Sequence, residues 1–367
     1  MSNTKVTDNS EINDVRTEAE FRSISFSGFK KTEVKNQLME NMKKGKIEPA
    51  CYWCAELICA GHYPDIWETI LHYVAKHIHL GNPKLIIYVD RRFNIFRNII
   101  SQGHFLSELD LRNFNNIRKL FAEIVCILTM SSKKNSFEQI KIKREEEFDI
   151  TQMTEKLKAP SVDYIQPLFQ PKDPKEIFIP MNELAYNLSR EKRNMNNVCY
   201  WIEWIIEFDV ICKRKKEPCY CEKRAEYKVE GKYQKDIIWI VWDVLLHYSN
   251  DLNNQYISSI MESVLNLFSI KYSTGSPKKR RYLLYFAVSL ITEYVPTNVE
   301  IISDKAILQN VIEKINDVYK QIKKNEFSPN TDYLFSGVDK KGDFEESMKR
   351  MEMMNQMMEN MGMSGMV

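Results

Sequence analysis

The sequence predicts an all-α protein built from two related helical bundles. Only 11 glycines and 12 prolines occur in 367 residues, too few for the dense turns of an all-β fold. An aromatic stretch around residues 50–74 is repeated around residues 198–249, which indicates an internal duplication. Apolar residues also recur at the spacing of one helix face, for example Trp67, Ile70, Leu71, Val74 and Ile78.

The first bundle is expected at residues 28–132, after a flexible arm at residues 1–27. Gly45 and Gly61 are expected to end its first two helices, and Pro64 to begin the third. The expected helices cover residues 30–45, 48–61, 65–80, 83–100 and 113–130.

Residues 133–180 change in composition and are expected to form a linker. The segment is charged and then holds five of the twelve prolines, which break helices and favour extended backbone. We expect the linker to be partly extended and to lie across the surface.

The second bundle is expected at residues 181–330, with an insertion at 213–235 and a Met-rich tail at 331–367. Cys51-Tyr52-Trp53 recurs as Cys199-Tyr200-Trp201, and Trp67 with the six residues after it recurs from Trp242. The neighbours of these tryptophans are apolar, which favours a packing core over exposed platforms for nucleobases.

Composition and charge argue against a membrane protein and against a protein that is drawn to nucleic acid by its overall charge. The net charge of +2 gives no general attraction to nucleic acid or membranes. No apolar run reaches the length of a membrane span, and the eight cysteines lie mostly in apolar helical segments, which is typical of reduced thiols. We therefore expect a soluble cytoplasmic protein without a membrane partner.

No pattern of catalytic or cofactor-binding residues stands out. The chain lacks the G-x-x-x-x-G-K-[ST] phosphate loop and the G-x-G-x-x-G fingerprint. The histidines of the first bundle lack a local nucleophile and orienting group. Cys212, Cys219 and Cys221 are weak zinc candidates, because no histidine completes a set of four ligands. We predict no enzyme, no cofactor and no small-molecule ligand.

Two basic runs are candidates for contacts with phosphates or with an acidic protein surface. Their usual role is a solvated loop, but two runs in one bundle could form one patch. The runs are Lys213, Arg214, Lys215 and Lys216, and Lys278, Lys279, Arg280 and Arg281.

The C-terminal tail is a candidate partner-binding segment. Residues 348–367 hold nine of the 17 methionines, and methionine is a flexible filler for apolar partner surfaces. The alternative is an unstructured end, because Gly362 and Gly365 limit a helix. One helical stripe would contain Met351, Met354, Met358 and Met361.

Residues 45–83 resemble the C-terminal helical collar of clamp-loader-type AAA ATPases. The resemblance covers the A-x-Y-W motif at Ala50–Trp53, a short glycine turn and the LGNP end at Leu80–Pro83. It implies a collar-like helical bundle and no activity, because the ATPase modules are missing. The Asn-, Lys- and Ile-rich style of the chain also resembles proteins of nucleocytoplasmic large DNA viruses.

The leading hypothesis is a non-enzymatic adaptor or assembly subunit of a larger intracellular complex. Viral replication, transcription or virion assembly would place it in a viral factory or a virion. The alternative is an accessory protein that binds nucleic acid through the basic runs. A third hypothesis is an enzyme with a site between the bundles, since binding sites favour such interfaces.

Overall fold

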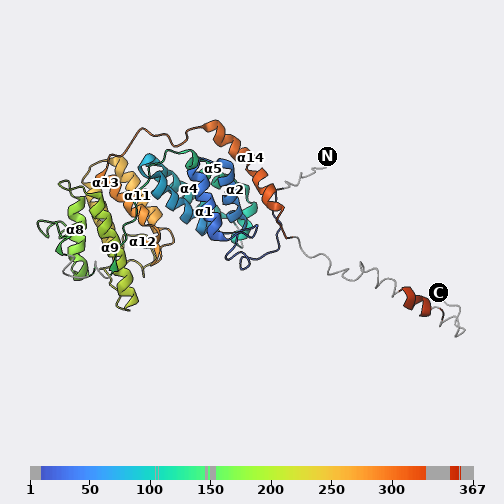
Figure 1. Ribbon diagram of the computed structural model, residues 1–367, viewed down its shortest axis with the longest axis horizontal. Coiled ribbons are helices and arrows are strands. Elements are labelled where there is room, and N and C mark those ends of the chain that lie inside the picture. The colour runs from blue at the N-terminus through green and yellow to red at the C-terminus, as the bar shows by residue number, and fades with distance from the viewer. Residues whose placement is uncertain are drawn as a thin grey trace. The chain divides into compact units, whose positions relative to one another are not determined.

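The computed structural model describes residues 10–103, 105, 107–144, 148, 154–327, 348–354 and 356. These residues form helices and two isolated bridges, with no β-strand among them, which confirms the all-α prediction (Figure 1). They divide into two units. The first contains residues 10–12 and 18–325, and the second contains residues 13–17 and the described residues after 325. None of the described helices is long and apolar enough to span a bilayer.

The first group of helices follows the expected boundaries closely. Gly45 and Gly61 have φ values of 71° and 75°, the left-handed conformation that ends a helix and that glycine adopts without strain. The group comprises α1 (Lys31–Lys43), α2 (Ile47–Cys59), α3 (Tyr63–Tyr73), a π-turn (Val74–Ile78), a 3-10 turn (His79–Gly81), α4 (Lys84–Gln102), a 3-10 turn (Glu108–Asn113) and α5 (Asn115–Met130).

The second group follows the linker and packs its own aromatic core. Asn194 and Asn254 begin two of its helices, because their side chains accept hydrogen bonds from the free amides of the first turn. The group comprises a 3-10 turn (Lys175–Ile177), α8 (Phe178–Leu188), α9 (Met195–Arg214), α10 (Ile238–Asn250), α11 (Gln255–Ser269), α12 (Ser276–Lys279) and α13 (Arg281–Thr292). The two groups meet where α4 packs against α11.

The last helix of this unit, α14 (Lys305–Lys323), packs against α2 and α5 (Figure 1). Asp304 caps it by accepting hydrogen bonds from the amides of Ala306 and Ile307. The sequence assigned residues 181–330 to the second bundle, yet this helix lies on the first. Its apolar face, which includes Ile315 and Tyr319, is buried there.

The repeated tryptophans occupy helices in the same chain order. Trp53 and Trp67 lie on α2 and α3, and Trp201 and Trp242 lie on α9 and α10. Common ancestry of the two groups stays a prediction. Five of the six tryptophans are buried, as the sequence predicted for the core. Trp53 is only half-buried, so its assignment to the core is wrong.

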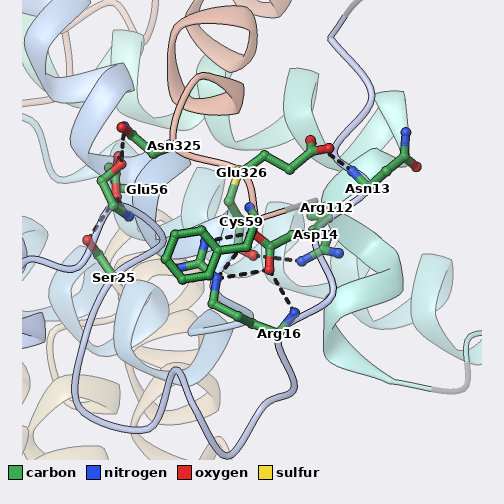
Figure 2. Close-up of polar contacts among 11 residues, drawn as sticks. Asn13, Asp14, Arg16, Ser25, Glu56, Cys59, Arg112, Asn325 and Glu326 are labelled. Carbon is green, nitrogen blue, oxygen red and sulfur yellow. Dashed lines mark hydrogen bonds and ion pairs between the residues drawn. The ribbon is translucent and has the colours of Figure 1, made fainter. Parts of the chain in front are cut away.

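Residues 10–27 make ordered contacts, although the sequence placed them in the flexible arm. The side chains of Ile12, Phe21 and Phe26 are fully buried, and that burial fixes the segment. Ser25 Oγ also donates a hydrogen bond to the buried Glu56 carboxylate at 2.8 Å (Figure 2).

The second unit is small and joins residues near both chain ends. Arg16 pairs with Asp14 at 2.6 Å and lies 4.1 Å from the ring centroid of Phe327 (Figure 2). The amide of Val15 donates to Phe327 O at 3.3 Å, and the amide of Asn13 donates to Glu326. Residues 13–17 are thereby tied to residues 326–327.

A buried arginine connects the linker and the insertion. Arg224 is fully buried and pairs with Asp173 of the linker at 2.6 Å and with Asp243 of α10 at 2.9 Å. Tyr227 also donates a hydrogen bond to Asp243. The insertion is therefore part of the folded core at this point, because a buried charge needs its partners in place.

Candidate functional site

Two arginines of the second basic run are buried and paired. The prediction that they contact phosphates or an acidic surface is therefore wrong. Arg280 pairs with Glu68 of α3 and donates to the carbonyl oxygens of Phe268 and Ile270. Arg281 pairs with the buried Glu203 of α9 at 3.0 Å. Both are only 5% exposed. Each neutralises a carboxylate, and Arg280 also caps the C-terminal end of α11.

The lysines at the start of each run are also paired with α9. Lys213 lies 2.6 Å from Asp209, and Lys278 lies 3.4 Å from Glu207. Four of the eight candidate cations are exposed and make no salt bridge with the described residues: Arg214, Lys215, Lys216 and Lys279. This leaves much less basic surface than the sequence suggested.

The three candidate zinc cysteines do not form a metal centre with the described residues, which hold no group of three potential ligands. Cys221 is buried and its thiol donates to Asp236 O at 3.4 Å. Burial raises the pKa of Cys219 and of Cys221 to about 12. Both thiols are therefore held in the protonated form, which is the less nucleophilic one.

His79 stands out among the histidines, of which His104 lies outside the described residues. It follows the π-turn with a φ of 47°, and its ring lies against Phe286. The ring is 1% exposed, and neither nitrogen has a hydrogen-bond partner among the described residues. Burial lowers its pKa to about 4, with Glu293 opposing and Lys134 adding to the shift.

We expect His79 to make the fold sensitive to acid. The unfolded chain binds a proton near the ordinary pKa of 6.5, whereas the folded ring resists it down to about 4. The contribution of the neutral His79 ring to stability is therefore fully present above pH 6.5 and is lost as the pH drops, by about 2 kcal/mol at pH 5. Asparagine tolerates positive φ and does not titrate. Urea unfolding of His79→Asn should show a smaller loss between pH 7 and pH 5, and an equal loss would contradict this assignment.

The predicted methionine stripe is described only in part. Residues 348–354 are helical, and Met351 and Met354 are 56% and 59% exposed. Met358 and Met361 lie outside the described residues. Partner binding by the tail stays a prediction.

A hollow of about 830 Å³ lies between α2 and α14 on the described surface. Trp53 is part of its wall on the α2 side, together with Pro49 one helical turn earlier. On α14 the wall carries Val311, Ile315 and Val318, at spacing i, i+4 and i+7. We call this hollow the α2–α14 groove.

Aromatic side chains extend the apolar surface of the α2–α14 groove. The ring of Phe29, 41% exposed, lies 5.4 Å from that of Trp53 in an edge-on contact. The ring of Tyr52 lies 5.3 Å from Trp53 on α2. Three charged side chains also line the groove: Glu48, Lys314 and Asp317. The groove thus combines apolar residues with charges of both signs, as protein interfaces do.

The sequence analysis did not find the α2–α14 groove. The apolar spacing on α14 was visible in the sequence, but its position on the first helix group depends on long-range packing. The exposure of Trp53 was hidden by its match to Trp201, which is 1% exposed.

Comparison with known proteins adds no relative, since no family model, no curated protein and no solved structure matches this chain.

Proposed function

We propose that the protein is a non-enzymatic adaptor that binds an amphipathic helix of a partner protein in the α2–α14 groove. The supporting observation is the position of Trp53. It is the one tryptophan of the six that is only half-buried, and it lines the α2–α14 groove. Tryptophan and tyrosine are the residues most enriched among the energetic centres of interfaces.

The form of the groove favours a helix as its occupant. The partly exposed Val311 and Val318 form an apolar ridge about 10 Å long on α14, two turns of helix, with the buried Ile315 between them in the sequence. Such a ridge packs into the grooves of another helix whose apolar residues repeat at i, i+3 or i+4, and i+7. The partner then belongs to the larger intracellular complex that the sequence analysis suggested.

Nucleic-acid binding has less support. Arg280 and Arg281 hold buried carboxylates, and Lys213 and Lys278 pair with α9. A surface that contacts phosphates needs free cations, and each contact adds to the salt dependence of binding. Nothing in the described geometry favours this second function over the adaptor.

The proposal predicts a partner that is lost on Trp53→Ala. Removing a central tryptophan of an interface costs about 2 kcal/mol or more, which weakens binding by roughly thirtyfold. Affinity purification from the source cells with the intact chain and with Trp53→Ala should show one stoichiometric protein that the variant fails to retain. Val311→Asp, on the opposite wall, should lose the same protein.

Tyr294→Ala is the matched control, because Tyr294 is 83% exposed and does not line the groove. It should retain the partner. Size-exclusion chromatography of each purified variant tests the other occupant, a second copy of the chain. If the groove variants keep every protein that the control keeps, or if they only dissociate a homodimer, the adaptor proposal is wrong.

A further inference from the structure

A second hollow lies between α3 and α4 on one side and residues 270–280 on the other, where the two helix groups meet. Its volume is about 590 Å³, in the range of small-molecule pockets. A neighbouring hollow of about 560 Å³ shares Phe93, Arg97, Ile270 and Lys271 with it. We call the first of these the α3–α4 cleft. None of its residues lines the α2–α14 groove.

Aromatic rings form much of the wall of the α3–α4 cleft. The Trp67 ring lies 5.0 Å from that of Phe93 and 5.5 Å from that of Phe96. The Tyr63 ring lies 5.5 Å from that of Phe96. All four side chains are buried and hold one another in place. Such a wall can contact the face or edge of a planar ring without reorganising.

The charges around the α3–α4 cleft leave an excess of cations. Asp65 is paired with Lys31 at 3.0 Å and with Lys35 at 2.8 Å, and Glu68 is paired with Arg280. The exposed Glu108 has no salt bridge with the described residues, but Lys271 faces it.

Three exposed cations of the cleft make neither a salt bridge nor a hydrogen bond within the described part of the chain: Arg97, Lys271 and Lys279. Arginine and lysine bind phosphate and carboxylate through charge-assisted hydrogen bonds. Because Glu108 is the one lining carboxylate without a salt bridge among the described residues and three cations line the same cleft, the cleft favours an anion.

Two buried donors in the same wall lack acceptors. The Tyr63 hydroxyl and the Trp67 indole N–H have no hydrogen-bond partner among the described residues, although both residues are at least 96% buried. A buried donor without an acceptor is costly, and neither atom is open to the cleft in this arrangement, so a ligand reaches them only if neighbouring side chains shift.

We propose that the α3–α4 cleft binds a small aromatic anion, a planar ring joined to a phosphate or a carboxylate. The ring packs against Trp67, Phe93 and Phe96. The anionic group is held by Arg97, Lys271 and Lys279. Because residues 270–280 belong to the second helix group and α3 and α4 to the first, the ligand contacts both groups.

Isothermal titration calorimetry of the full chain tests the proposal. The probes are the four ribonucleoside 5′-monophosphates and, for the carboxylate class, indole-3-acetate. At least one should bind with a Kd below millimolar, and adenosine and inorganic phosphate alone should each bind more weakly. Added salt should weaken binding, because the charges are exposed. Binding of a nucleotide would identify the anionic group as a phosphate, and binding of indole-3-acetate would identify it as a carboxylate.

Arg97→Gln and Lys271→Gln should each weaken binding of that probe by about tenfold, the loss of one charge-assisted contact. Lys192→Gln removes an exposed cation outside both the cleft and the α2–α14 groove and should leave the Kd unchanged. Both cleft positions are exposed, so thermal unfolding should show intact folding. If no probe binds at millimolar concentration, or if both cleft variants bind as tightly as the intact chain, the proposal is wrong.

Discussion

Replacing Arg281 by methionine should destabilise the fold by about 3–5 kcal/mol, because it leaves a buried carboxylate without its counter-charge. Glu203 is 2% exposed, and it accepts hydrogen bonds from Arg281 at 3.0 Å and from the Tyr285 hydroxyl at 2.8 Å. Burial raises the pKa of Glu203, with Arg281 opposing the shift. Urea unfolding at pH 7 measures the loss.

Two further variants make the result specific. Arg281→Met combined with Glu203→Gln should recover part of the loss, because no charge is left buried. Lys279→Met removes an exposed cation from the same basic run and should change stability by about 0.5 kcal/mol or less. A similarly small effect of Arg281→Met would mean that its guanidinium is solvated, and would restore it as a candidate for binding polyanions.

Trp242→Ala should cost about 3–5 kcal/mol, as expected for a large-to-small change in a well-packed core. The Trp242 side chain is fully buried and its ring lies 5.2 Å from that of Phe268. Urea unfolding is again the measurement.

Trp53→Ala is the comparison within the repeat, because the half-buried Trp53 loses less contact area on truncation. It should cost clearly less than Trp242→Ala. Equal costs would contradict the difference in burial on which the α2–α14 groove rests.

Local pattern predicted the helices well, because periodicity and caps are encoded within a few residues. Gly45 and Gly61 end helices as expected, and α4 begins directly after Pro83. The position of α14 was not predictable in the same way. Its apolar face could have packed on either helix group, and only the complete set of neighbours decides between them.

The predicted basic surface was wrong for a related reason: charge runs in the sequence do not show which side chains are buried. Lys278 to Arg281 reads as one solvated patch, yet two of the four are buried beside Glu68 and Glu203, more than 70 residues away in the chain. The α2–α14 groove and the α3–α4 cleft were missed because each joins segments far apart in the sequence. Trp67 was recognised as a core residue, but its unpaired indole N–H is visible only in the structure.

The most direct test of the adaptor proposal is photo-cross-linking from the rim of the α2–α14 groove. A photoreactive amino acid at Lys314, which is exposed and lines the groove, would be activated in the source cells, with the same residue at Tyr294 as the control. The proposal predicts one cross-linked partner from position 314 and none in common with position 294. The attached peptide should carry apolar residues at i, i+3 or i+4, and i+7. Cross-links only to the same chain, or the same products from both positions, would contradict it.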